Sequence, residues 1–178
     1  MENDTDQCIA TLQNAVSECK SEWIALSGGL DSSILAHLRK NQKPQAMTII
    51  TKDFLGTDLT FAQIVAKHTG LNLSLMQVTM EEVLDSINET IKILDNFNDI
   101  EIRNSIVPHI YLSSLKKKGV DSIITGDGAD ELFAGYNFLL NKSNDELDEE
   151  LKRIKKIMHF PSKDIAKSLN MKVENPFL

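Results

Sequence analysis

Short apolar runs and longer amphipathic stretches alternate along the chain. Apolar runs at residues 23–26, 46–51, 71–78 and 121–125 have the length of buried strands. Between them, apolar side chains recur at helical spacing, which predicts helices in an N-terminal segment and at residues 33–40, 59–68, 80–97 and 108–118. Strands that alternate with helices indicate an α/β fold, a doubly wound parallel sheet with helices on both faces and right-handed crossovers.

Glycine and proline set the expected ends of two of these helices. Gly70 follows the 59–68 helix in the place of a C-terminal glycine. Pro108 is placed at the start of the 108–118 helix, because proline is tolerated in a first turn, and Gly119 marks the end of that helix.

The C-terminal part of the chain has a different pattern. Residues 145–158 place four apolar side chains on one helical stripe, namely Leu147, Leu151, Ile154 and Met158. On the other side, the pairs Asp148–Lys152 and Glu149–Arg153 are spaced for contact at i, i+4. This pattern predicts a solvated amphipathic helix packed on the core. With no internal repeat or low-complexity linker, residues 1–178 are expected to form a single domain.

Net charge narrows the range of partners. The formal charge of −7 gives no basic surface for nucleic acid or an anionic membrane. No apolar run approaches the length of a bilayer span, and the N-terminal residues lack the pattern of a signal peptide. We therefore expect a cytoplasmic protein without nucleic-acid or membrane partners.

The cysteines and histidines do not indicate a metal centre. Cys8 and Cys19 share a helical face with Leu12 and Val16, so they are expected to be reduced thiols in the core. The four histidines lack metal-ligand spacing, and no CxxC motif is present.

A serine- and glycine-rich segment lies between the first predicted strand and the helix that follows it. Its seven residues are Ser27, Gly28, Gly29, Leu30, Asp31, Ser32 and Ser33. Backbone N–H groups at such a turn can surround a phosphate chain, and glycine lets the backbone approach closely. The serine hydroxyls add donors, and Asp31 suits a magnesium ion that bridges phosphates. The segment is not a Walker A loop, which needs a lysine after its second glycine.

A second glycine-rich segment, residues 125–136, follows the last predicted strand. Three of its acids, Asp127, Asp130 and Glu131, fall within five positions and suit metal binding together with an acid–base or positioning role. In a doubly wound sheet, loops at the carboxyl ends of strands converge on one ligand near the switch in strand order. The two glycine-rich segments are therefore expected to form one site.

These two segments carry a resemblance to a known family. The SGGLDSS segment resembles the pyrophosphate-binding loop of N-type ATP pyrophosphatases, and GDGADELFAGY looks like the signature of asparagine synthetases. Two weaker similarities support it: RNSIVPHIYL at residues 103–112, and the C-terminal residues 173–178, which are similar to the family's ARVPFLD run. The chain thus resembles the synthetase domain of the glutamine-dependent enzymes.

The resemblance implies a reaction and a set of roles. In the family, the aspartate side-chain carboxylate attacks the α-phosphate of ATP, pyrophosphate leaves, and ammonia displaces AMP from the β-aspartyl-adenylate. By matching positions, residues 27–33 would hold pyrophosphate, and Asp31 with Asp130 would bind Mg²⁺. Asp127, Glu131 and Tyr136 are the catalytic candidates. Contacts to the nucleotide are expected from Leu26, Thr125 and Gly126, and from the strand end at Ile50 or Thr51.

The sequence also departs from the family. It contains no glutaminase half, so ammonia is expected from solution or from a separate glutaminase subunit, and the family's further C-terminal helices have no counterpart here. A homodimer is compatible with the sequence. Two other functions stay open: an adenylating enzyme with a different acceptor, as in the β-lactam synthetase branch, and an ATP- or AMP-binding module without synthetase activity.

Overall fold

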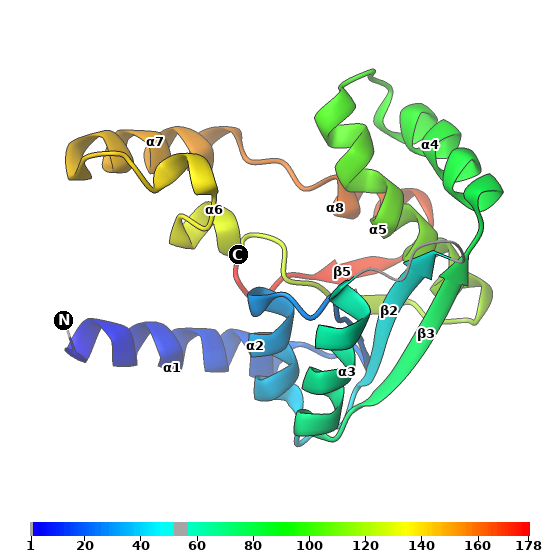
Figure 1. Cartoon of the computed structure of the whole chain (residues 1–178), viewed down its shortest axis with the longest axis horizontal. Helices are drawn as coiled ribbons and strands as arrows, with labels where there is room; N and C mark the ends of the chain where they lie inside the picture. Colours follow the sequence, from blue (N-terminus) through cyan, green and yellow to red (C-terminus); the bar gives the residue numbers. More distant parts are fainter. Residues whose placement is uncertain (1, 52–56) are drawn as a thin grey trace.

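A computed structural model describes residues 2–51 and 57–178 (Figure 1). Its five strands form one parallel sheet in the order β3-β2-β1-β4-β5. The strands are β1 Trp23–Ala25, β2 Gln45–Thr51, β3 Asn72–Val78, β4 Ser122–Ile124 and β5 Lys172–Glu174. The expected doubly wound α/β fold is therefore confirmed.

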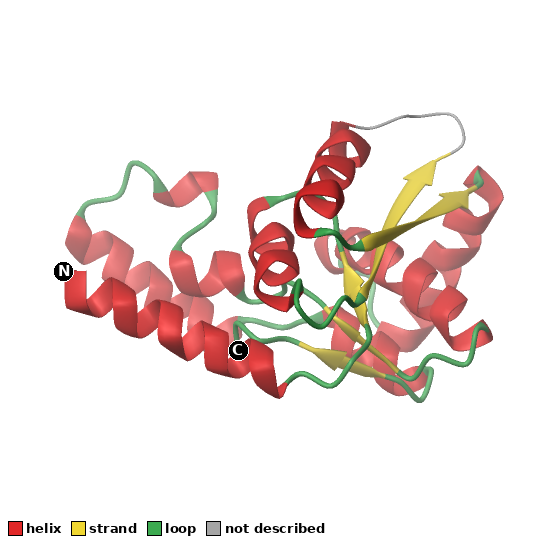
Figure 2. Cartoon of the chain, turned by 90° about the horizontal axis from the view of Figure 1, so that it is seen from below, coloured by secondary structure: helices red, strands yellow, loops and turns green. Residues whose placement is uncertain are grey.

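Helices cover both faces of the sheet. One face carries α1 Glu2–Glu18, α2 Leu30–Arg39 and α3 Thr57–Thr69. The other carries α4 Met80–Leu94, α5 Asp99–Lys117 and α8 Pro161–Ser168 (Figures 1 and 2). A further segment contains α6 Ala129–Phe133, the 3-10 helix η1 Asn137–Leu139 and α7 Asn144–Ile157. Helix α7 contacts α6, and with α1 it projects to one side of the sheet in both views.

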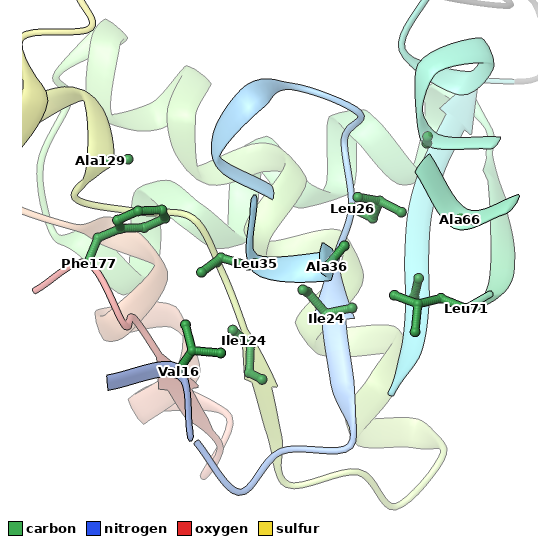
Figure 3. Close-up of a cluster of buried hydrophobic side chains, with 12 residues drawn as sticks. Val16, Ile24, Leu26, Leu35, Ala36, Ala66, Leu71, Ile124, Ala129 and Phe177 are labelled. Carbon is green, nitrogen blue, oxygen red and sulfur yellow. The ribbon is translucent and has the colours of Figure 1, made fainter. Parts of the chain in front are cut away.

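Strand pleating divides the core in two. Successive side chains of a strand point to opposite faces, and the central strands β1 and β4 are apolar on both. Ile24 and Ile124 join the cluster under α1 and α2, where Figure 3 shows them with Leu35. Their neighbours Trp23 and Ile123 belong with the cluster under α5 and α8. The sheet is therefore buried on both sides.

The carboxylate of Glu174 fixes the end of α1 to strand β5. The backbone N–H groups of Lys20 and Ser21 donate to its Oε2 at 2.8 and 3.0 Å, and Lys172 donates to Oε1 at 3.1 Å. Burial opposes the charge of this carboxyl, but these donors prevail and hold its pKa below the ordinary value. The contact joins segments more than 150 residues apart, and the residue is buried.

Two expectations about helix boundaries are wrong. Helix α5 begins at Asp99, capped by the side chain of Asn98, and Pro108 lies inside it rather than at its start. Proline has no N–H, so the carbonyl of Asn104 receives no helical hydrogen bond from position 108. Helix α2 begins at Leu30, so the last four residues of the SGGLDSS segment form its first turn.

The surface helices also differ from expectation. The apolar stripe of α7 is at least half-buried, as expected, but α7 contacts α6, and Arg153 pairs with Glu150 rather than Glu149. Cys8 is exposed and Cys19 half-buried, so the expected pair of core thiols is wrong for Cys8. Residues 4–11 of α1 face solvent, since the helix extends beyond the sheet there.

Candidate active site

A cavity of about 620 Å³ opens where the strand order reverses, beyond the carboxyl ends of β1 and β4. Open α/β sheets bind ligands in the crevice at such a switch point. The loop after β1, the end of β2, the loop after β4, one face of α5 and the start of α8 all line the cavity.

Serine side chains stabilise the conformation of the loop after β1 through hydrogen bonds within the loop. Ser27 Oγ accepts from the N–H of Gly29 at 3.2 Å and lies 3.1 Å from Ser32 Oγ. Ser32 Oγ in turn donates to the carbonyl of Gly29 at 3.2 Å. No side chain caps the N-terminus of α2. The first-turn N–H groups of a helix have no intrahelical acceptor, so here they are available to an anion.

Gly28 is required by both backbone conformation and space. Its φ is +84°, and a Cβ built there would lie 2.5 Å from the backbone nitrogen of Ala62 and 2.6 Å from Phe61 Cβ. The start of α3 therefore packs directly on the turn of the phosphate-type loop, which only glycine permits.

The two loops meet beside an acidic cluster. A Cβ on Gly126 would lie 3.1 Å from Asp31 Cβ, so the β4 loop runs against the first turn of α2. Burial raises the pKa of Asp31, and the charges of Asp130 and Glu131 raise it further. Within residues 2–51 and 57–178, no three acidic, histidine or cysteine side chains are arranged to hold a metal by themselves. A magnesium ion here would need phosphate oxygens as additional ligands.

Asp127 is the centre of a second polar network. Its Oδ2 accepts hydrogen bonds from Thr125 Oγ1 at 3.0 Å, Ser162 Oγ at 2.5 Å and Asn175 Nδ2 at 3.2 Å. Asn175 also donates to Thr125 Oγ1 at 2.7 Å. Three donors on one oxygen fix the carboxylate and leave Oδ1 without a hydrogen bond from the part of the chain that the structure describes. Asp127 is thus oriented by the loop after β4, by α8 and by the segment after β5.

Tyr136 and Glu131 form a pair at the edge of this region. The hydroxyl of Tyr136 donates to Glu131 Oε1. Burial raises the pKa of Tyr136, and the hydrogen bond to Glu131 raises it further, together with the charges of Glu131 and Asp130. The phenol therefore stays protonated and orients Glu131.

Most of the residues expected at the site come together, but five do not line the cavity. Those that line it are Leu26, Ser27, Gly29, Asp31, Ser32, Thr51, Thr125, Gly126, Asp127, Asp130 and Glu131. Of the two alternatives at the end of β2, Thr51 lines it and Ile50 does not. Gly28 and Tyr136 support lining residues. Leu30 is 75% exposed, and Ser33 lines a separate cavity between α2 and α3.

The opposite wall of the cavity holds residues that the sequence patterns did not identify. One face of α5 presents Asn104, Val107, Pro108 and Tyr111, and the start of α8 presents His159, Phe160, Pro161 and Ser162. Their signal in the sequence was faint: four positions at helical spacing in the RNSIVPHIYL segment, and a Pro-Ser pair that begins a short helix.

Comparison with known proteins identifies the family of the chain. A family model for asparagine synthase matches residues 12–175, which is most of the chain. The chain belongs to the asparagine synthase family. The glutamine-hydrolysing asparagine synthetase B of Escherichia coli is 29% identical over 160 residues, which cover 82% of this chain and 28% of that protein. Asparagine synthetase 3 of Arabidopsis thaliana is 30% identical over 149 residues, or 76% and 25% of the two chains.

This member of the family therefore spans between a quarter and a third of the length of these relatives. Among solved structures, a "predicted subunit of tRNA methyltransferase" from Methanocaldococcus jannaschii superposes with a TM-score of 0.50 at 16% identity, covering 88% of this chain and 67% of that one. An NH3-dependent NAD synthetase from Campylobacter jejuni gives 0.47 at 19% identity, with 94% and 77% covered. The first likeness concerns the fold alone.

In the described residues, no helix has the length and apolar character that crossing a bilayer requires.

Proposed function

We propose that this chain catalyses ATP-dependent amide synthesis, in which the side-chain carboxylate of aspartate is activated as an acyl-adenylate and converted to asparagine by ammonia. The observation that carries the proposal is the meeting of an uncapped phosphate-type loop and a fixed carboxylate, Asp127, at the switch point of the sheet. The first suits a polyphosphate, and the second suits proton transfer at a reacting centre.

In the first half-reaction, an oxygen of the acceptor carboxylate forms a bond to the α-phosphorus of ATP. The bond from that phosphorus to the bridging oxygen breaks, and pyrophosphate leaves with the electron pair. The N–H groups at the start of α2 and the hydroxyls of Ser27 and Ser32 stabilise the departing pyrophosphate. The walls of the cavity align the two reactants for in-line displacement.

In the second half-reaction, the nitrogen of ammonia attacks the acyl carbon and the carbon–oxygen bond to AMP breaks. The nitrogen must lose one proton. Asp127 Oδ1 carries no hydrogen bond from the described part of the chain, so it is the atom to accept that proton, directly or through water. Three donors on Oδ2 keep this carboxylate in place throughout.

The acidic cluster fits a magnesium ion. Asp31 and Asp130 would supply its protein ligands, because their mutual repulsion is relieved by a cation and hard oxygen ligands are those magnesium prefers. When bound, such an ion neutralises charge on the phosphates. Glu131, oriented by Tyr136, lies in the same cluster as a positioning group.

The proposal extends to the nitrogen source, the partner chains and the cellular compartment. Ammonia would come from solution or from a separate glutaminase subunit, and a homodimer is compatible with the exposed faces of α1 and α7. The free thiols of Cys8 and Cys19 fit a reducing compartment such as the cytoplasm.

The test is to identify the product of α-labelled ATP incubated with the chain, magnesium, ammonium and aspartate. Labelled AMP that appears only with aspartate supports the proposal. AMP formed with another carboxylate in place of aspartate would identify the different acceptor that the site tolerates. ATP binding without any product would assign the chain as a nucleotide-binding module, and labelled ADP would contradict the reaction class.

A further inference from the structure

Tyr111 places an unused hydrogen-bond donor in the wall of the cavity. Its side chain is only 6% exposed and belongs to the same buried cluster as Met47 and Ile123. Within the described residues its hydroxyl has no hydrogen-bond partner. The fully enclosed side-chain polar atoms without a partner are Arg39 Nε and Asn175 Oδ1, so the Tyr111 hydroxyl is not enclosed and reaches the cavity that the residue lines.

The ring of Tyr111 is buried, but its hydroxyl faces the cavity and has no partner within the described part of the chain. Tyrosine hydroxyls usually find a hydrogen-bond partner when the ring is buried. Phenylalanine would fill the same apolar cluster but would present no donor to the cavity. The hydroxyl of Tyr111 is therefore free to bond to a ligand group that enters the cavity.

The ligand group is an acceptor of hydrogen bonds. Burial raises the pKa of Tyr111, and the charge of the nearby Asp127 raises it further. The phenol accordingly stays protonated and donates. An oxygen atom that carries negative charge gains most from such a donor, since charge-assisted hydrogen bonds are the strong ones.

The position of Tyr111 in the cavity indicates which oxygen of the ligand accepts its hydrogen bond. Helices α2 and α5 cover opposite faces of the sheet (Figure 1). Tyr111, on α5, therefore lines the cavity from the side opposite α2 and the phosphate-type loop. The acidic groups divide in the same way, because Asp31 is influenced by Asp130 and Glu131 whereas Tyr111 is influenced by Asp127. In an in-line displacement, the nucleophile approaches the phosphorus from the side opposite the leaving group. With pyrophosphate on the α2 loop, the acceptor lies toward α5.

We infer that Tyr111 is a substrate-binding residue that donates its hydroxyl to an oxygen of the acceptor carboxylate, and of the acyl-adenylate formed from it. The inference rests on the proposed function. It assigns the acceptor half of the ligand to the α5 wall, beside Asp127, and the pyrophosphate half to the loop after β1. The hydroxyl holds the carboxylate close to Asp127 despite the like charge of the two groups.

The test compares Tyr111→Phe with the natural chain in calorimetric binding of two probes. One is β-aspartyl sulfamoyl adenosine, a stable mimic of the acyl-adenylate, and the other is AMP, which lacks the acyl group. Loss of one hydrogen bond should weaken binding of the mimic about tenfold and leave AMP affinity within about twofold. Ile110→Val is the matched control, because Ile110 is a buried neighbour on α5 that does not line the cavity. Both variants should melt within about 2 °C of the natural chain.

The outcomes separate the two claims. If the natural chain prefers the mimic over AMP and Tyr111→Phe loses most of that preference, the assignment stands. If the preference survives in Tyr111→Phe, the Tyr111 assignment is overturned while adenylation of aspartate is left intact. If the natural chain binds the mimic no more tightly than AMP, the acceptor site itself is absent, and both the assignment and the proposed function fall.

Discussion

Asp31 stands in surroundings that disfavour its charge. Burial and the neighbouring acids Asp130 and Glu131 raise the pKa of its carboxyl above the ordinary value of 3.8. The folded chain therefore binds a proton more tightly at this position than the unfolded chain does, and stability falls as the pH rises from 3.8 toward the raised pKa. A residue that destabilises the ligand-free fold is typical of a binding site.

Asp31→Asn should consequently stabilise the ligand-free chain and weaken its binding of ATP. At neutral pH the melting temperature should rise by about 2 °C or less, because solvent screens a partly exposed group. The gain should disappear below pH 3.8, where both the folded and the unfolded carboxyl are protonated. Thermal melts across this pH range measure the first effect, and calorimetry with magnesium should show at least about tenfold weaker ATP binding. Unchanged ATP affinity would remove Asp31 from the metal assignment.

Gly28 offers a direct check on the packing of α3 against the phosphate-type loop. Gly28→Ala should cost about 3 kcal/mol or more in free energy of unfolding, because strain at positive φ is added to a collision with Ala62 and Phe61. Gly70→Ala is the matched control: its φ is +71°, but nothing lies within 4 Å of the new Cβ, so it should cost only about 1 kcal/mol. Urea unfolding of both variants measures the difference. Equal losses would mean that α3 does not pack on the loop.

At the scale of elements, the sequence predicted the segments with a clear apolar pattern and missed those without one. The apolar run at Trp23 and the glycine turn after it sufficed to predict β1 and its loop, because a parallel strand buried on both faces is apolar throughout. Helix α6 has only five residues, too few to show a period, and β5 has no apolar run because charged residues flank Val173. Proline is common in a first turn, so Pro108 predicts a later start for α5 than the structure shows, with Asn98 capping the helix ten residues earlier.

The contact between β5 and the end of α1 depends on a buried carboxylate. Glu174→Gln should lower the free energy of unfolding by about 1 to 3 kcal/mol at neutral pH, since the backbone donors of Lys20 and Ser21 lose a charged acceptor. The pKa of Glu174 is depressed, so its contribution is present above 4.5 and is lost as the pH falls through the folded pKa. Denaturant unfolding at several pH values should show the variant and the natural chain converging in acid. Glu89, which forms an exposed ion pair with Lys92, provides the control. Glu89→Gln should leave the free energy of unfolding nearly unchanged.

Helix α8 reaches the Asp127 carboxylate through the hydroxyl of Ser162. Ser162→Ala removes one of the three donors to Asp127, which should lower the rate of AMP formation about tenfold without unfolding the chain. Ser168→Ala on the same helix is the matched control, because that hydroxyl donates only to the carbonyl of Ile165. Steady-state rates and melting temperatures of both variants decide the matter. A Ser162→Ala variant as active as Ser168→Ala would show that orientation of Asp127 by α8 is dispensable.

At the scale of the molecule, the site exists because a parallel sheet reverses its strand order between β1 and β4. This arrangement brings Asp31 and Gly126 into contact although they are 95 positions apart in the sequence. The rule that ligands bind at such a point could be applied from the sequence alone. The sequence did not predict the wall of the cavity that α5 and the start of α8 form. Tyr111 fits the apolar pattern of a core helix, and only the packing of α5 over the sheet turns its hydroxyl toward the cavity.

The measurement that tests the central claim most directly follows one oxygen atom. Aspartate labelled with ¹⁸O at both oxygens of its side-chain carboxylate is incubated with the chain, ATP, magnesium and ammonium. The masses of the products are measured by mass spectrometry. Attack of the carboxylate on the α-phosphorus transfers one carboxylate oxygen to the phosphate of AMP, so AMP should carry one ¹⁸O and asparagine should retain the other. AMP without the label, or ADP in place of AMP, would show that the cavity does not activate a carboxylate by adenylation.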